Sequence, residues 1–359
     1  MDSSNVAVFS VCSVCYLPKA LVLAESVFRM DNIKTVIYLI DRKGPAVQES
    51  QFADIRWIED EGIPDFYNLA FKYDVTELST CVKPMLAERL LANHSKVIFL
   101  DPDICVYSSL QSLEAELVSH PILLTPHYCT PIDSREENYD LAMMRFGSFN
   151  LGFFAVSSDP EARRFLRWWS DRCIALGYFE TQFGLSTDQK WVSIAPCFFP
   201  NIKILYDPGY NMAFWNLHER ALVGTENGYA VNGQSSLIFF HFSSFDEKRP
   251  RSVFKRSHAW RESGREDLFK ICDDYAAALK RFDQGYSSVE YGFDYLDNGW
   301  YVSPTLRRAY AAVESELGLE NPFVVDKPIL SFIRMNHLRE RKNARFRPEG
   351  AGDISQHSS

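Results

Sequence analysis

The feature that most constrains the fold is an alternation of short apolar runs with helical segments in the first hundred residues. Apolar runs occur at 5–14, 35–41 and 97–100. Between them, 18–30 and the stretch that begins at Pro84 carry apolar residues at helical spacing. The run at 97–100 has no polar interruption, which is typical of a strand covered on both faces of a parallel sheet. The alternation predicts an α/β fold with a largely parallel central sheet flanked by helices.

The middle of the chain breaks into loops and short strands. Strands are expected at 121–126, at 149–157 and at 235–246, where the last strand runs into a polar turn. A helix is expected over 160–176, because Asp159-Pro160 is a typical opening and Gly177 a typical end.

Three parts are expected along the chain. Residues 1–260 would form the α/β domain, and 261–337 a C-terminal extension that reads as mainly helical. Residues 338–359 are basic and then polar, which predicts a frayed tail. The basic run Arg334–Arg347 could make weak contact with an anionic membrane surface, although a solvated tail is the simpler interpretation.

Charge and cysteine usage narrow the class of protein. A net charge of −9 argues against a broad nucleic-acid surface. The eight cysteines are scattered, no secretory signal pattern opens the chain, and no apolar run reaches the roughly 18 residues of a membrane span. We therefore expect a soluble cytoplasmic protein with free thiols. Cys12 and Cys15 are better explained as core thiols than as a zinc or redox pair, since no second pair accompanies them.

Two aspartates follow the apolar run at 97–100, in the sequence Asp101-Pro102-Asp103. Pro102 favours extended geometry at Asp101, and in an extended segment residues i and i+2 point the same way. Close carboxylates repel one another unless a positive group lies between them. The pair is therefore a candidate cation site, although solvated turn aspartates are an equally simple alternative for an isolated motif of this kind.

Six short motifs, in order, resemble the GT-A glycosyltransferases, and most of all the family-8 type of glycogenin and the bacterial lipopolysaccharide galactosyltransferases. They are YLPKALVLAESV, the lysine upstream of the aspartates, FLDPDICV, FNLGFFAV, TDQKW and FFHFSS. The resemblance spans roughly residues 8–245 and implies a Rossmann-like GT-A fold. The residues that match the motifs of that family are Tyr16, Lys83, Asp101, Asp103, Asn150, Gly152, Asp188, Gln189 and His241.

The sequence departs from that family after the histidine. The usual H-F-x-G-x-x-K-P-W is replaced by HFSSFDEKRPR, in which Ser244 stands at the glycine and Glu247 in the lysine register. Lys248 falls one position later. This places the diphosphate-binding details in question and suggests a bacterial relative outside that exact family.

The resemblance implies a division of roles. Asp101, Asp103 and His241 would bind a divalent metal, with the histidine nitrogen favouring Mn²⁺ over Mg²⁺. Asp188 and Gln189 would be catalytic, lining the donor-sugar pocket. The residues expected to bind the nucleotide-sugar donor are Tyr16, Asp41, Lys83, Asp101, Asn150, Gly152, Ser243 and Lys248, of which Asp41 is included because it ends the expected strand 35–41.

Each of these residues also has a plain structural interpretation. His241 could be a hydrogen-bonded core histidine, Lys83 a surface lysine, and Asn150 a turn cap. Asp188 could stabilise the start of a helix that contains Lys190.

The expected activity is metal-dependent transfer of a sugar, with UDP-sugars favoured by analogy. The acceptor would be a glycan, a lipid-linked molecule or a protein, and the outcome retention, again by analogy. A haloacid-dehalogenase-like phosphohydrolase also uses D-x-D after an apolar strand, but leaves Asn150, Asp188 and His241 without a role. A pyrophosphorylase is disfavoured because no glycine-rich loop follows the first strand. A non-catalytic sugar-binding module of the same fold is the third alternative.

Overall fold

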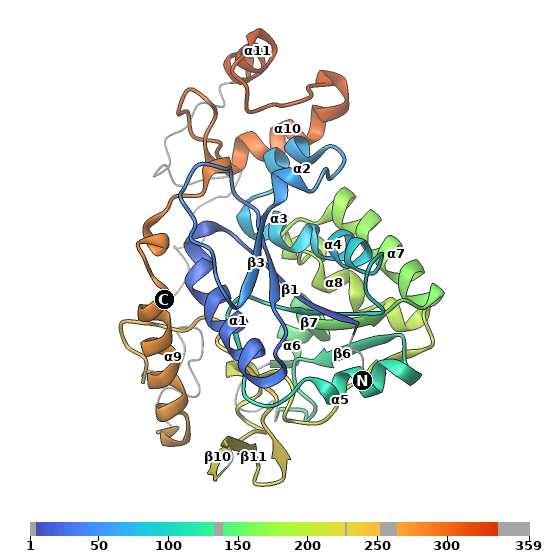
Figure 1. Cartoon of the computed structure of the whole chain (residues 1–359). Coiled ribbons are helices and arrows are strands. Elements are labelled where there is room, and N and C mark those ends of the chain that lie inside the picture. Colours follow the sequence, from blue (N-terminus) through green and yellow to red (C-terminus); the bar gives the residue numbers. More distant parts are fainter. Residues whose placement is uncertain (1–4, 133–138, 227, 252–263, 337–359) are drawn as a thin grey trace, which may run out of the picture.

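A seven-stranded sheet forms the centre of the computed structural model, which describes residues 5–132, 139–226, 228–251 and 264–336 (Figure 1). The strand order is β3-β2-β1-β4-β7-β6-β8. The strands are β1 (Val6–Cys12), β2 (Thr35–Leu39), β3 (Ala53–Trp57), β4 (Lys96–Leu100), β6 (Ile122–Pro126), β7 (Phe149–Ser157) and β8 (Ile202–Ile204).

The sheet is largely parallel, which confirms the expected fold class. β1 is parallel to both β2 and β4, β2 is parallel to β3, and β6 is parallel to β8. β7 is the exception, because it lies between β4 and β6 and is antiparallel to both. As a result, Leu100 at the carboxyl end of β4 pairs with Phe153 in the middle of β7, and the first half of β7 continues past the end of β4. The Asp101 amide then donates to the Gly152 carbonyl at 2.7 Å.

Helices cover the sheet largely where the sequence predicts them. α7 follows Asp159, whose side chain accepts from the Glu161 amide at 2.7 Å, as expected for an Asp-Pro opening. β3 and the two short helices after it have no counterpart in the sequence prediction. The α-helices described in this part are α1 (Leu17–Asp31), α2 (Phe66–Lys72), α3 (Val75–Cys81), α4 (Lys83–Leu90), α5 (Gln111–Ser119), α6 (Tyr139–Phe146), α7 (Pro160–Leu176) and α8 (Gln189–Val192).

Two three-stranded sheets complete the α/β part. One has the order β5 (Ile104–Val106), β13 (Phe239–His241), β9 (Met212–Ala213), and the other the order β10 (Leu222–Thr225), β11 (Gly228–Val231), β12 (Ser235–Ser236). The single strand expected over 235–246 is therefore two short strands that belong to different sheets. β13 pairs antiparallel with β5, which places His241 opposite Ile104, one residue after the aspartate pair.

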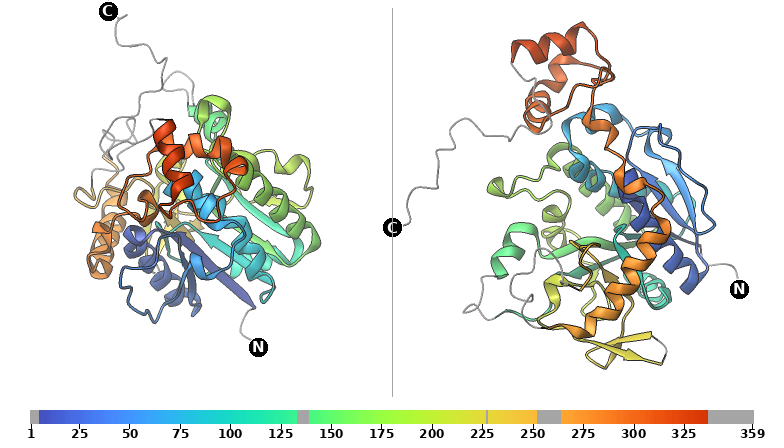
Figure 2. Two further views of the ribbon diagram at one scale, coloured as in Figure 1. Left: turned by 90° about the horizontal axis from the view of Figure 1, so that it is seen from above. Right: turned by 90° about the vertical axis from the view of Figure 1, so that its left-hand side faces the viewer.

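The C-terminal part is helical, as expected, and packs against the α/β part. α9 (Phe269–Phe282) lies along α1, and α10 (Pro304–Leu317) lies against α2. Figure 2 shows α10 and α11 (Lys327–Met335) at one end of the molecule. Phe293, Tyr310 and Phe332 belong to the same apolar core as strands of the main sheet.

The boundary at 260/261 stays a prediction, and the tail 338–359 lies outside the described residues. None of the helices in the described ranges combines the length and apolar character that crossing a bilayer requires.

One buried guanidinium joins the C-terminal part to the main domain. Arg307 on α10 is 2% exposed, and it donates to backbone carbonyls on both sides of the contact as well as to the Asp294 carboxylate at 3.0 Å. These carbonyls belong to Ala70, Phe71, Tyr73 and Phe293. Burying this charge is tolerable because both terminal nitrogens of the guanidinium donate to several acceptors.

We expect Arg307→Met to lower the free energy of unfolding by about 3 kcal/mol, because the buried carbonyls and Asp294 lose their donor. Urea unfolding followed by circular dichroism measures this. Arg334→Met, at an exposed arginine of α11, is the matched control and should change stability by less than about 0.5 kcal/mol. Equal stability of the two variants would show that the contact is dispensable.

Candidate active site

Two carboxylates and an imidazole meet at the carboxyl end of β4. His241 Nε2 lies 3.0 Å from Asp103 Oδ1 and 3.9 Å from Asp101 Oδ2. One ligand atom from each of the three residues lies within 4.8 Å of the others, a spacing that could hold a metal ion. Burial raises the pKa of Asp103, but the charge and hydrogen bond of His241 outweigh it and lower that pKa to about 2.

The local backbone differs from the extended segment that was expected. The Ile104 amide donates to the Asp101 carbonyl at 3.0 Å, so residues 101–104 form a turn between β4 and β5. The two carboxylates still converge on His241, because β13 brings the imidazole to the turn. The meeting of the side chains was expected, and the extended geometry given as its reason was wrong.

Gly152 makes room for the imidazole. A Cβ atom at this position would lie 2.4 Å from His241 Cε1, closer than non-bonded carbon atoms approach. The glycine of the F-N-x-G segment is therefore required by the position of His241.

Asn211 holds the same imidazole from the other side and was missed in the sequence. Its Oδ1 lies 3.3 Å from His241 Nδ1, and its Nδ2 donates to Asn150 Oδ1 and Thr125 Oγ1, each at 3.0 Å. An acceptor at Nδ1 favours a proton there, so Nε2 is the ring nitrogen that could bind a metal ion beside the aspartates. The only local signal was its left-handed backbone, φ 54°, which asparagine tolerates.

Lys83 is buried between carboxylates, which excludes the surface-lysine interpretation. It is 4% exposed, and its Nζ lies 3.2 Å from Asp101 Oδ1, 3.4 Å from Asp188 Oδ2 and 3.0 Å from the Leu151 carbonyl. Burial lowers the pKa of Lys83, but the two aspartates outweigh it, so the pKa is raised and the lysine stays charged.

Asp188 contacts the site rather than capping its helix. α8 (Gln189–Val192) begins after it, yet the Asp188 side chain makes no capping hydrogen bond. Burial raises the pKa of Asp188, and Lys83 opposes that rise only in part.

Gln189 links the site to the start of β7 through hydrogen bonds. Its Oε1 accepts from the Leu151 amide at 3.2 Å and from Asn150 Nδ2 at 3.4 Å. Its Nε2 donates to the Phe146 carbonyl at the end of α6 (Tyr139–Phe146) at 2.9 Å. The pair Asp188-Gln189 and the segment containing Asn150 and Gly152 therefore form one hydrogen-bonded unit.

Tyr16 and Lys19 lie together at the start of α1. Tyr16 is 44% exposed, and Lys19 Nζ lies 4.2 Å from the centroid of its ring. The charge of Lys19 also helps to lower the pKa of Asp103. Lys19 is thus a further cation near the aspartates, and sequence reasoning did not single it out.

The structure records no contact between the cluster and the remaining donor-binding candidates, Asp41, Ser243 and Lys248. Asp41 is buried and accepts hydrogen bonds from the amides of Val14, Arg42 and Gly292, so its recorded contacts hold these backbone segments in place. Ser243 is partly exposed and Lys248 is exposed on the turn after β13. Within that turn Ser244 has φ 62°, the left-handed conformation that favours the glycine of the resembling family. Donor binding by Asp41, Ser243 and Lys248 stays a prediction.

Two unpaired ring nitrogens lie behind the imidazole. The Trp215 ring stands edge-on to His241, with centroids 5.1 Å apart, and His127 packs against Trp215 at 5.5 Å. Neither Trp215 Nε1 nor His127 Nδ1 has a hydrogen-bond partner among the described residues. Burial lowers the pKa of His127 to about 4, so this imidazole is neutral at pH 7.

Comparison of sequences finds two relatives and no family model. The chain is 23% identical over 224 residues to the uncharacterized protein YfnF of Bacillus subtilis, a match that covers 62% of this chain and 73% of YfnF. It is 30% identical over 148 residues to the uncharacterized protein YfnD of the same organism, covering 41% of this chain and 45% of YfnD.

Comparison of structures finds glycosyltransferases. A galactosyltransferase, LgtC, in complex with donor and acceptor sugar analogues matches 79% of this chain and 99% of its own, at 16% identity and a TM-score of 0.48. GlyE of Streptococcus pneumoniae TIGR4 matches 80% and 64%, at 14% identity and a TM-score of 0.42. Mouse xyloside xylosyltransferase 1 matches 66% and 97%, at 12% identity and a TM-score of 0.41.

Because His127 is neutral in the folded chain, we expect the free energy of unfolding to decrease at acidic pH. The unfolded chain takes up this proton near pH 6.5 and the folded chain only near pH 4, so stability is full above pH 6.5 and falls below it. Between pH 7 and pH 5 this histidine should cost about 2 kcal/mol of unfolding free energy. Urea unfolding of wild type and His127→Gln at the two pH values measures the difference.

The variant should lose less stability than wild type over that interval. His94→Gln, at a partly exposed histidine before the opposite end of β4, is the control and should keep the wild-type loss. Parallel pH profiles for wild type and His127→Gln would contradict the assignment.

Proposed function

We propose that the chain is a metal-dependent glycosyltransferase that uses a nucleotide-diphosphate sugar. The observation that carries this proposal is the convergence of Asp101, Asp103 and His241 at the end of β4, next to the Lys83–Asp188 contact. Similarity of the motifs to the GT-A glycosyltransferases supports the same activity.

The donor set fits a divalent cation. The carboxylates of Asp101 and Asp188 share the buried ammonium of Lys83, and the third carboxylate, of Asp103, contacts His241. The excess of negative charge favours a cation, and two carboxylates with an imidazole suit Mn²⁺ better than Mg²⁺. Bound there, the ion would neutralise charge on a departing diphosphate.

The protein's own residues would share the remaining work. Lys19 stands where a cation could meet the diphosphate, whereas Lys83 is committed to holding Asp101 and Asp188 in place. The buried carboxylate of Asp188 would stabilise positive charge developing at the anomeric carbon, because a charge in a water-poor site acts strongly. Gln189 would keep Asp188 and the β7 start in register.

The finer points belong to the same proposal. UDP-sugars are the favoured donors, the acceptor is a glycan, a lipid-linked molecule or a protein, and the outcome is retention, all by analogy with the resembling family. The cytoplasmic location expected from the sequence is proposed with them. A haloacid-dehalogenase-like phosphohydrolase is not favoured, because it gives no role to His241, which contacts Asp103, or to Asp188, which contacts the same lysine as Asp101.

Nucleotide binding with and without a metal ion tests the proposed metal site. Wild type should bind UDP tightly with Mn²⁺ and far more weakly in EDTA, and Asp103→Asn should lose the metal-dependent part because it removes one anionic ligand. Isothermal titration calorimetry with UDP, after a thermal-shift screen of UDP-, GDP-, TDP- and CMP-sugars, measures this. Asp171→Asn, at an exposed aspartate of α7, is the control. Metal-independent nucleotide binding in wild type would refute the assignment.

A substitution at Asp188 distinguishes an enzyme from a binding module. Asp188→Asn should lower kcat by about a hundredfold, near 3 kcal/mol of barrier, while the donor dissociation constant changes much less. Release of nucleoside diphosphate from the best donor gives kcat, and calorimetry gives the affinity. A binding module would show nucleotide-sugar affinity without release, and a purely structural aspartate would give a less stable variant with normal kcat.

A further inference from the structure

A cavity lies away from the candidate active site. It measures about 590 Å³ and is lined by α1, β5, the β10–β11 hairpin and α9. In Figure 1 these elements occupy the lower left, with the yellow hairpin below α1 and α9. Six of its lining residues carry the argument: Arg29, Cys105, Tyr107, Tyr229, Tyr275 and Ala278.

This cavity is on the opposite face of the small sheet from the metal candidates. His241 pairs with Ile104, and Phe240 pairs with Cys105. Directly opposed residues share a face and successive residues alternate, so Cys105 and Phe240 face away from the His241 imidazole. None of the candidate active-site residues lines the cavity. A ligand bound here would occupy a separate site.

The interior of the cavity suits a flat apolar group. The rings of Tyr107 and Tyr229 meet edge to face with centroids 5.5 Å apart. Tyr275, which is 2% exposed, also lines the cavity. The three tyrosine rings together offer an apolar surface against which a flat group could pack.

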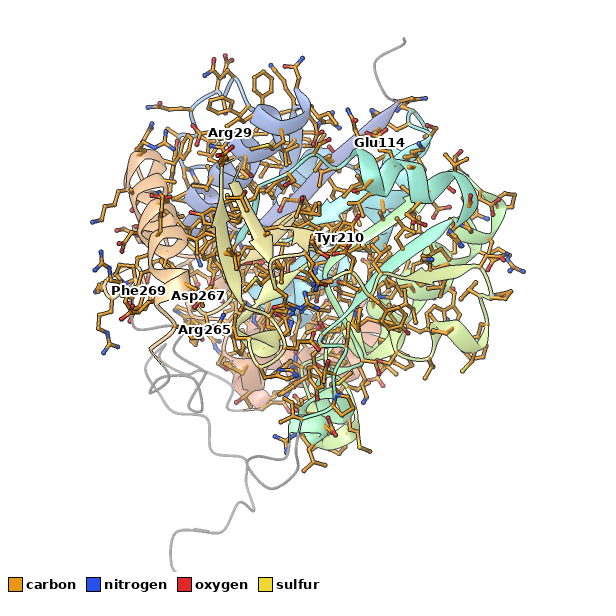
Figure 3. All side chains as sticks on the ribbon, turned by 90° about the horizontal axis from the view of Figure 1, so that it is seen from below. Arg29, Glu114, Tyr210, Arg265, Asp267 and Phe269 are labelled. Carbon is orange, nitrogen blue, oxygen red and sulfur yellow. The ribbon has the colours of Figure 1, made fainter. Side chains whose placement is uncertain are left out.

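The rim of the cavity has one uncompensated charge, and it is positive. Arg281 pairs with Glu25 and Lys270 pairs with Asp274, each at 2.7 Å. Arg29 is exposed and makes no ion pair with the described residues. Figure 3, a view from below, shows Arg29 beside the yellow hairpin. An anionic group would therefore be held at Arg29.

We propose that this cavity binds a small amphipathic anion, with a flat apolar body against the tyrosines and an acidic group at Arg29. Its volume lies within the range of about 300–1,000 Å³ that small-molecule sites occupy. The inference concerns a different face of the molecule from the proposed function and does not depend on it.

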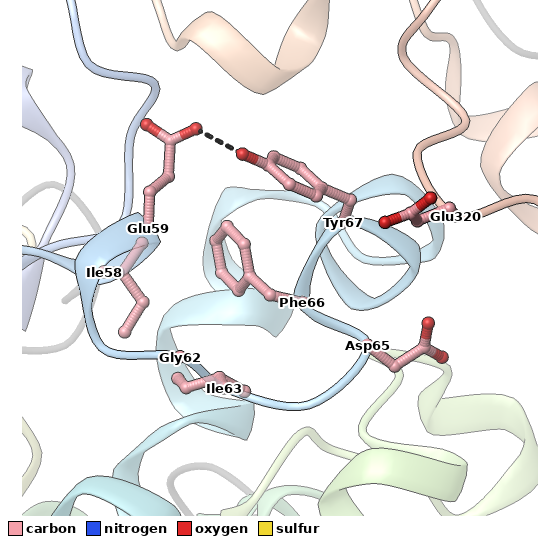
Figure 4. A pocket seen from close by; sticks show the side chains of 8 residues that line it. All are labelled: Ile58, Glu59, Gly62, Ile63, Asp65, Phe66, Tyr67 and Glu320. Atoms are coloured by element: carbon pink, nitrogen blue, oxygen red, sulfur yellow. Dashed lines mark hydrogen bonds between the residues drawn. The ribbon is translucent and has the colours of Figure 1, made fainter.

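A smaller depression provides a contrast in charge. It measures about 310 Å³ and lies between η2 (Ile58–Asp60), α2 and Glu320 (Figure 4). Carboxylates of Glu59, Asp65 and Glu320 line it, and Tyr67 donates to Glu59 at 3.1 Å. These carboxylates disfavour anions, so an anionic probe discriminates between the two cavities.

The test is a fluorescence titration of the full chain with 8-anilinonaphthalene-1-sulfonate, which has a planar aromatic body and one sulfonate. Ala278→Trp fills the cavity from α9, and Ala277→Trp, on the exposed side of the same helix, is its matched control. Arg29→Glu reverses the rim charge, with Arg334→Glu at an exposed arginine of α11 as control. Melting temperatures show whether each variant is folded.

Wild type, Ala277→Trp and Arg334→Glu should show one saturable site with similar affinity. Ala278→Trp should abolish the site, and Arg29→Glu should raise the dissociation constant by about tenfold or more, as expected for loss of a charge-assisted contact. Absence of a saturable site in wild type would overturn the proposal. Wild-type affinity in Arg29→Glu, or in a folded Ala278→Trp, would do so as well.

Discussion

The site depends on the contacts that the buried ammonium of Lys83 makes with two carboxylates. The ammonium lies within 3.4 Å of carboxylates from β4 and from the start of α8, two segments far apart in the chain. Without it Asp101 and Asp188 would be like charges with no positive group between them. Lys83 offsets their repulsion and opposes the rise in the pKa of Asp188 that burial causes.

Backbone arrangement then decides where the imidazole stands. β7 runs antiparallel beside β4 and brings Asn150 and Gly152 to the end of the strand that delivers the aspartates. Gly152 leaves space that any side chain would fill, and Asn211 fixes the ring within that space. The result is an imidazole with Nε2 directed at Asp103, held by residues that do not themselves have to touch a ligand.

Much of this arrangement is readable from the sequence, and the limits have physical causes. Apolar patterning locates β1, β2, β4 and β7 as apolar runs and α1 by its helical spacing, whereas capping residues locate α7. It misses β7's antiparallel direction, since a strand buried on both faces reads alike in either direction. It also misses β3 and the split of 235–246 into two strands, because short segments carry too few periods.

The candidate site was predictable where residues carry chemistry in a familiar order. The aspartate pair and His241 do meet, and Lys83, Asn150, Gly152, Asp188 and Gln189 surround them. Lys83 lies among carboxylates instead of at the surface, because its environment comes from segments about 70 and 100 residues away. Asn211, Trp215 and Lys19 gave no sequence signal, since a loop asparagine, an apolar-run tryptophan and a helix-start lysine are common in any protein.

The most direct measurement is X-ray diffraction from crystals grown with UDP and MnCl₂, using anomalous scattering from manganese. The account predicts one anomalous peak bounded by Asp101, Asp103 and His241, with the diphosphate of UDP beside it and its phosphate oxygens in contact with the ion. An anomalous peak elsewhere, or bound UDP with no metal between it and these three residues, would contradict it.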